Sequence, residues 1–466
     1  MKKLLCILLA LVMAVSMLTA CGQKNEPENT PATEPEKNDA PTTAEPAPEA
    51  SGDDVGFDKL DIVAFTGGYG DMWSELLALF QEKYPNVEIV SDLGSDVETR
   101  VRTRMMTETP PDIVFISGSN EYDIYEAANS GMLYDLSDWF ANGVNADGDK
   151  MTDVLSPARL APGTMNGAVY LPTILTGYAG WWYNAALFRE KGWEVPTSYE
   201  ELDALSEKIQ AEGIIPLMYQ AVNYAIWGYM YEAIAAAGGY DAYADCFINL
   251  KEGAWTSDAA LEAVTQMSKL VADGTLSKNS VAVEFTQAQI DFVNDRVAMI
   301  PCGTWFENEM KESTPEGFEM TFMPFPAKDS NGVQYITAFD TTIAVPAECQ
   351  NPEAAKAFLG VIYSVEGQKI VTKYGALPVT NTCTTDDIAE YMTPTMESAV
   401  EGAASGKIGF VSNNPEQWYA PMWPTLQACI ADLVLEEITP EEFCQKMEAA
   451  AKAVREDDTI VKFSTN

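Results

Sequence analysis

The chain has 466 residues, of which 47% are hydrophobic and 10% aromatic, and its 70 acidic and 28 basic residues give a formal net charge of −42. A field of that sign repels phosphate, which excludes nucleic acid as a partner. The absence of histidine excludes Ser-His-Asp and Cys-His catalysis and histidine-containing zinc sites.

The first 20 residues are typical of a lipoprotein signal peptide. Lys2 and Lys3 precede an apolar run over residues 4–18, and Leu-Thr-Ala-Cys at 18–21 forms a lipobox. This order indicates secretion, and the thiol of Cys21 can then take a diacylglyceryl group. An ordinary signal peptide or an uncleaved anchor is the alternative, although the run is short for a membrane span of about 20 residues. We expect a lipid anchor at Cys21 and a location on the extracellular face of the cell membrane.

Residues 21–56 are rich in Pro, Glu, Thr and Ala and offer almost nothing to bury. This composition predicts a disordered, acidic tether that prolines hold extended. The body that follows is longer than a single core usually supports, so two domains are expected. It has no second apolar run of about 18 residues, which would indicate another membrane span.

The body alternates short apolar strands with capped helices, which indicates an α/β fold. Strands are expected at residues 60–65, 87–90 and 112–116, and helices from near Asp71, Thr197, Asn351 and Thr439. Thr197 to Glu200 has the pattern of a capping box. The apolar residues 225–239, interrupted by Glu232, predict a buried helix. Trp181 to Tyr183 alternate along a strand, so one face of that strand is expected to reach the core.

The cysteines and glycines suggest no cofactor or metal. Six of the eight cysteines lie in the body without a C-x-x-C pair, so three disulfides and buried free thiols both remain open. The glycine cluster at residues 67–70 is neither a P-loop nor a dinucleotide fingerprint.

Three segments carry a family resemblance by their order. WWYNAALF at 181–188, followed by Gly192 and PTSYEEL at 196–202, resembles "YN..LF...G...P.TW.EL". RVAMI at 296–300 and GTW at 303–305 resemble "G.AAM...G.W". NPEAAKAFL at 351–359, with 364–368 and GALP at 375–378, resembles "A..F..FL.S.E.Q......G..P". From about residue 58 to the end, the chain resembles the maltodextrin-binding-like, sugar-binding family of extracellular solute-binding proteins of ABC transporters.

The resemblance implies a two-lobed α/β fold like that of periplasmic binding proteins, with hinge strands and a central ligand cleft. The N-terminal lobe would comprise residues 57–168 and 340–392, and the C-terminal lobe residues 169–339 and 393–466. Hinge strands are expected near 169–173 and 335–338. A monomer that delivers a carbohydrate to ABC permease subunits is implied. Members that import N-acetylglucosamine or chitin fragments resemble this chain at residues 213–216, 224–227 and 238–239.

Sugar capture needs flat aromatic walls for the C–H faces and polar groups for the hydroxyls. Trp305 and Trp423 stand where the family places stacking aromatics, and Tyr224 and Trp227 resemble a third aromatic element. Core packing is the alternative for these rings. The remaining candidate ligand-binding residues are Gly68, Tyr69, Ser117, Asn120, Tyr178, Asn223 and Asp340. A turn or cap role is the alternative for the loop residues, and a structural salt bridge is the alternative for Asp340.

The function expected from this sequence is non-enzymatic capture of a sugar or oligosaccharide for an ABC permease. A lipoprotein glycoside hydrolase is one alternative, because such an enzyme needs two carboxylates and no histidine. A binding protein for a non-sugar solute is another.

Overall fold

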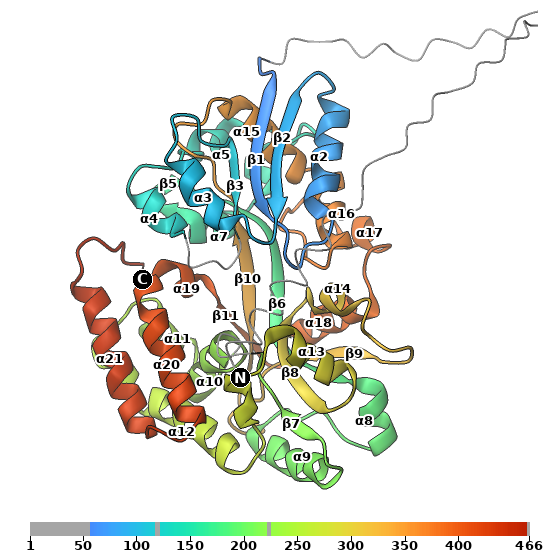
Figure 1. The fold of residues 1–466 in the computed structure, drawn as a ribbon, viewed down its shortest axis with the longest axis vertical. Helices are drawn as coiled ribbons and strands as arrows, with labels where there is room; N and C mark the ends of the chain where they lie inside the picture. Colours follow the sequence, from blue (N-terminus) through green and yellow to red (C-terminus); the bar gives the residue numbers. More distant parts are fainter. Residues whose placement is uncertain (1–55, 117–121, 221–224, 464–466) are drawn as a thin grey trace, which may run out of the picture. The chain divides into compact units, whose positions relative to one another are not determined.

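The structure is a computed structural model, and it describes residues 56–116, 122–220 and 225–463 (Figure 1). The predicted signal peptide, Cys21 and the predicted tether up to residue 55 lie outside the described residues. Within the described ranges, no helix combines the length and the apolar character that crossing a lipid bilayer requires.

A three-stranded parallel sheet with the order β2-β1-β3 forms the centre of the first lobe. Its strands are β1 (Lys59–Phe65), β2 (Glu88–Gly94) and β3 (Ile113–Phe115), close to the predicted strands. Leu60 and Ile62 of β1 pack in one core and Val63 packs in another, because successive side chains of a strand point to opposite faces. Both faces of the sheet are therefore covered, as is usual for parallel strands.

Helices supply the rest of these two cores (Figure 1). The core on the face of Leu60 includes residues of α2 (Met72–Lys83), α5 (Ser137–Asn142), α6 (Met151–Val154), α15 (Pro352–Ile362) and α16 (Val365–Lys373), with Leu160 of α7 (Pro157–Leu160) packed against it. The core on the face of Val63 includes α3 (Glu98–Met105) and α4 (Ile124–Asn129). The short strands β4 (Thr164–Met165) and β5 (Ala168–Val169) pair with each other, and α17 (Thr385–Ile388) follows α16. The helices predicted near Asp71 and Asn351 are confirmed as α2 and α15.

A six-stranded mixed sheet forms the centre of the second lobe, with the order β11-β10-β6-β8-β7 and with β9 also paired to β6. Its strands are β6 (Thr173–Asn184), β7 (Ile215–Leu217), β8 (Val297–Gly303), β9 (Met320–Met323), β10 (Gln334–Thr342) and β11 (Ile408–Ser412). Trp181 and Trp182 point to opposite faces of β6, and both are fully buried. Both faces of this strand are therefore core at this point, and neither indole is accessible to solvent.

The helices of the second lobe follow the predicted pattern with one correction. They are α8 (Ala185–Lys191), α9 (Tyr199–Ala211), α10 (Tyr231–Gly238), α11 (Tyr240–Phe247), α12 (Asp258–Ala272), α13 (Phe285–Val293), α14 (Phe306–Met310), α18 (Pro394–Ala404), α19 (Asn414–Trp418), α20 (Trp423–Val434) and α21 (Pro440–Glu456). The cap of α9 is Ser198 rather than Thr197, because the Ser198 hydroxyl accepts from the amide of Glu201. Thr197 instead donates to the Glu201 carboxylate at 2.7 Å. The capping box at Thr439 is confirmed.

Strands β6 and β10 connect the two lobes. They pair antiparallel, with Thr337 opposite Ala179 and Asp340 opposite Thr176. Leu175 packs in the core of the first lobe and Ala179 in that of the second, so β6 passes between the cores within four residues. The crossing lies a few residues after the expected hinge at 169–173, and the hinge function of these strands stays a prediction.

The six body cysteines are buried and free, which favours the thiol alternative. In the described part of the chain, no group of three or more Cys, Asp or Glu side chains is arranged to hold a metal ion.

Candidate functional site

The loop after β1 brings Gly68 and Tyr69 to the carboxyl end of the parallel sheet, where open α/β sheets bind ligands. Gly68 and Gly70 have φ of 77° and 51°, values that favour glycine because it lacks a Cβ. The Tyr69 ring packs edge-on against Phe115 with centroids 5.5 Å apart. The loop after β1 is therefore a tight glycine turn, and the Tyr69 side chain in it packs against β3.

Trp305 of the second lobe lies against this loop, although it is more than 200 residues away in sequence. The neighbouring Asn308 donates from Nδ2 to the Gly68 carbonyl at 3.0 Å. A Cβ at Gly68 would lie 3.9 Å from Cδ1 of Trp305. The indole is half-buried and packs edge-on against Phe339 of β10 at 5.1 Å. Gly303 makes this pose possible, since a Cβ there would lie 2.1 Å from the indole.

Glu309 places a carboxyl group beside these residues. One helical turn after Trp305, its Oε2 accepts from Nε2 of the buried Gln289 at 2.7 Å. Its Oε1 lies 3.5 Å from the position of a Cβ at Gly68. Burial raises the pKa of Glu309 to about 7, and the bond from Gln289 offsets this in part. A carboxyl that is partly protonated at neutral pH can both donate to and accept from a hydroxyl.

Asp340 forms an ion pair with Arg159 of α7, with Nη1 and Oδ1 2.8 Å apart. This is the structural alternative raised for Asp340, although a carboxylate has lone pairs for further donors. Tyr178 lies near this pair, and burial raises the pKa of Tyr178, an effect that Arg159 opposes. Its ring is 5.9 Å from Phe410, which is 44% exposed. Tyr178, Asp340, Arg159 and Phe410 make up a second cluster. Tyr178 and Asp340 lie on β6 and β10, the strands that connect the lobes.

Trp423 occupies a core position, which corrects the expected stacking role. The side chain is 2% exposed and lies 6.3 Å from the ring of Tyr231. Its Nε1 donates to the carbonyl of Glu416. The indole therefore has neither a free face nor a free donor for a sugar, because α20 packs its first turn onto α10.

Five candidates cannot be placed as binding side chains. Ser117, Asn120, Asn223 and Tyr224 lie outside the described residues, and of Trp227 the structure describes the backbone but not the side chain. The structure therefore brings together Gly68 with Trp305, and Tyr178 with Asp340.

Comparison with known proteins gives the family. The profile of the family described as "Bacterial extracellular solute-binding protein" matches residues 67–369. The chain belongs to this family. Its members are binding proteins rather than enzymes, and the hydrolase alternative therefore has no support.

Two curated relatives and one solved structure are similar to this solute-binding protein. The diacetylchitobiose binding protein NgcE of Streptomyces coelicolor is 27% identical over 317 residues, which are 66% of this chain and 66% of that protein. The multiple sugar-binding protein of Streptococcus mutans is 23% identical over 307 residues, 63% of this chain and 70% of its own. The structure of a chitin oligosaccharide binding protein has a TM-score of 0.68 at 20% identity, covering 85% of this chain and 98% of its own. This solved structure and the present chain share the α/β fold of periplasmic binding proteins.

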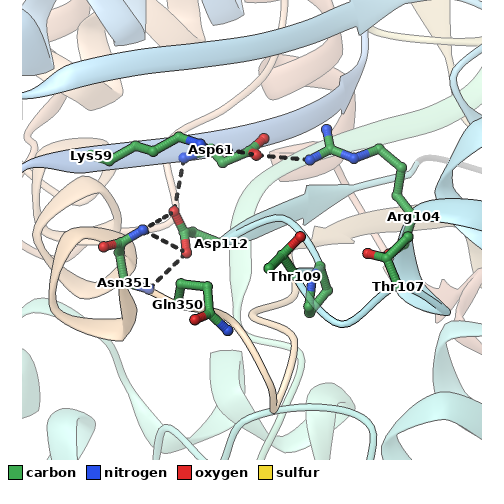
Figure 2. Close-up of a pocket in the computed structure, with 9 residues that line it drawn as sticks. Lys59, Asp61, Arg104, Thr107, Thr109, Asp112, Gln350 and Asn351 are labelled. Carbon is green, nitrogen blue, oxygen red and sulfur yellow. Dashed lines mark hydrogen bonds and ion pairs between the residues drawn. The ribbon is translucent and has the colours of Figure 1, made fainter.

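A polar hollow of about 420 Å³ lies elsewhere in this solute-binding protein, beside the amino ends of β1 and β3 (Figure 2). Its carboxylates are engaged by protein hydrogen bonds and an ion pair. Asp112 accepts from the Asp61 amide at 2.8 Å and from the Asn351 amide at 2.9 Å, and Arg104 donates to Asp61 at 2.8 Å. These bonds tie β1, β3 and α15 together, so we assign the hollow a structural role.

Sequence reasoning missed Asn308, Glu309, Arg159 and Phe410. Glu309 could have been found, because residues four apart share a helix face and Trp305 was already a candidate. Arg159 and Phe410 carried no such signal. Arg159 contacts Asp340, and Phe410 contacts Tyr178, only because the fold brings together elements that are far apart in the sequence.

Proposed function

We propose that this protein captures a sugar or oligosaccharide outside the cell and delivers it to the permease of an ABC transporter. The observation that carries the proposal is the family match together with the sugar-binding names of its relatives. Because the match spans 66% of NgcE, the ligand and the permease partner belong to the proposal.

The contacts around Trp305 suit a sugar. A half-buried indole can stack on the C–H face of a pyranose. Glu309 and Asn308 lie within one helical turn of it and supply carboxyl and amide groups for hydroxyls, and each hydroxyl buried without a partner would cost about 1–3 kcal/mol. Because Gly68 has no side chain, Trp305 and Glu309 lie close to the backbone of the loop. An aromatic wall next to mixed donors and acceptors is the arrangement that discriminates sugars from apolar solutes.

Chitin fragments are the first ligands to test. NgcE is named for diacetylchitobiose, and the structural relative is named for chitin oligosaccharides. An N-acetyl group adds an amide donor and acceptor to the hydroxyl pattern, which side chains such as Asn308 and Glu309 can pair. We also propose that Cys21 anchors the protein by lipid to the extracellular face of the membrane.

A thermal-shift screen tests the proposal. The chain from residue 22 should melt at a higher temperature with diacetylchitobiose or a longer chitin fragment, because ligand at about 100 times Kd adds about 2.7 kcal/mol to the folded state. Maltose, galactose and an amino-acid mixture are the comparison ligands. Stabilisation by the amino acids and by no sugar would overturn sugar capture, whereas stabilisation by maltose alone would change only the class of sugar.

A further inference from the structure

The last described segment, residues 457–463, contacts both lobes, and we call it the C-terminal strap. In Figure 1 the chain leaves α21 and returns toward α19. Asn129 at the end of α4, in the first lobe, donates from Nδ2 to the Thr459 carbonyl at 3.3 Å. The amide of Phe463 donates to the hydroxyl of Tyr419, in the second lobe, at 2.8 Å. The strap therefore bridges the two lobes, in addition to β6, β10 and the bond from Asn308 to Gly68.

Phe463 anchors the strap among aromatic rings of both lobes. It stacks on Trp418 with centroids 4.1 Å apart and planes 9° apart. It also packs edge-on against Tyr125 of α4, with centroids 6.1 Å apart. A ring that packs on Trp418 and Tyr125 together can keep both contacts only while α4 and α19 stay close.

The strap is folded upon itself rather than loosely attached. The amide and hydroxyl of Thr459 donate to Oδ1 of Asp457 at 2.9 and 2.6 Å. Nζ of Lys462 donates to the carbonyls of Asp457 and Ile460, each at 2.6 Å. Because the turn is braced internally, Thr459 and Phe463 are held at a fixed separation, as a bridge requires.

We propose that the C-terminal strap is a latch that stabilises the closed arrangement of the two lobes. Lobes that separate around β6 and β10 must break the contacts of the strap with Asn129 and Tyr125 or those with Trp418 and Tyr419. A contact made only in the closed state shifts the population toward that state, so the latch favours retention of a captured ligand. This inference rests on the proposed function and on the predicted hinge at β6 and β10, but its first test needs no ligand.

The test compares four variants of residues 22–466, which include every described residue. Phe463→Ser removes the stack on Trp418, and Phe463→Tyr keeps it. Asn129→Ala removes the bond to the first lobe and leaves the strap attached to the second. Asn294→Ala is its matched control, an exposed asparagine whose amide donates to Ile290 of its own helix at 2.8 Å.

Without ligand, X-ray scattering should give a larger radius of gyration for Phe463→Ser and Asn129→Ala than for the unaltered chain. Their Kd for diacetylchitobiose should rise about fivefold or more, a coupling typical of a conformational equilibrium. Phe463→Tyr and Asn294→Ala should match the unaltered chain in both measurements.

An unchanged radius in Phe463→Ser, even with a lowered Tm, would overturn the latch and leave the strap as a brace of the second lobe. A larger radius in Phe463→Ser but not in Asn129→Ala would support the latch and show that the contact of Phe463 with Tyr125, rather than the bond from Asn129, connects the strap to the first lobe. If the unaltered chain binds no sugar, the proposed function fails, and the scattering comparison still decides the latch.

Discussion

At the scale of single residues, Trp305 and Trp423 show how surroundings decide a role. Both are tryptophans for which the family resemblance predicts stacking on a sugar. Trp305 is half-buried next to a loop of the other lobe, whereas Trp423 is 2% exposed with its N–H engaged. An indole can stack on a ligand only if one of its faces is accessible, so the two side chains should respond differently to truncation.

Trp305→Ala should weaken binding of the sugar found in the screen by about 2 kcal/mol or more, as for aromatic anchors at desolvated sites, which is about a thirtyfold rise in Kd. Trp423→Ala should instead lower stability by about 3–5 kcal/mol, because it leaves a cavity in the core. Calorimetric titration and melting of the unliganded variants separate the two effects. A Trp423→Ala protein of normal Tm that no longer binds sugar would contradict the core assignment.

At the scale of elements, helix α10 carries an ionisable group in the core. Glu232 is fully buried, and its carboxyl bonds to the hydroxyl of Thr337 in β10. Its second carboxyl oxygen, Oε2, is buried without a hydrogen-bond partner among the described residues. Burial raises the pKa of Glu232 well above the usual 4.5, and the bond from Thr337 offsets this only in part. The carboxyl is therefore protonated in the folded protein under conditions in which the unfolded chain ionises.

The pH dependence of stability follows from this difference. Because the folded pKa of Glu232 is above the unfolded one, the free energy of unfolding should fall as the pH rises above about 4.5. Glu232→Gln removes the ionisable group and keeps a neutral partner for Thr337. The difference in Tm, variant minus wild type, should increase as the pH is raised from 4 to 8. A difference that stays constant over this range would contradict protonation of Glu232 in the folded protein.

At the scale of the whole molecule, the proposed lipid anchor decides where the protein works. Two or three acyl chains hold a protein durably, whereas one chain binds only marginally. The field of the acidic body repels anionic lipid, so attachment should depend on the lipid alone.

Cys21→Ala should therefore move the protein from the membrane fraction to the medium, or leave it unprocessed, without changing the melting of the body. Fractionation with a lipid label and an immunoblot measures this. Ser16→Ala, a substitution inside the predicted signal peptide but outside the lipobox, is the control and should leave the protein in the membrane fraction. A Cys21→Ala protein that is cleaved, lipid-labelled and membrane-bound would show that the anchor lies elsewhere.

The sequence alone determined the fold class and the helices that begin near Asp71, Thr197, Asn351 and Thr439, although the cap of the second lies one residue later than predicted, at Ser198. Strand alternation and helix caps are local properties, because they depend on neighbours within a few residues. Composition excluded histidine-based catalysis in the same direct way. The ordered motifs indicated the family, which the match over residues 67–369 shows.

Only the tertiary structure decided which candidate side chains meet. It joined Gly68 to Trp305 and Asp340 to Arg159, and it packed Trp423, at the start of α20, onto α10. Trp305 and Trp423 are the same residue type, and no local pattern tells which indole a distant helix will cover. The accessible faces depend on contacts between residues far apart in the chain, such as the 240 positions between Gly68 and Asn308, and these form only when both lobes are packed.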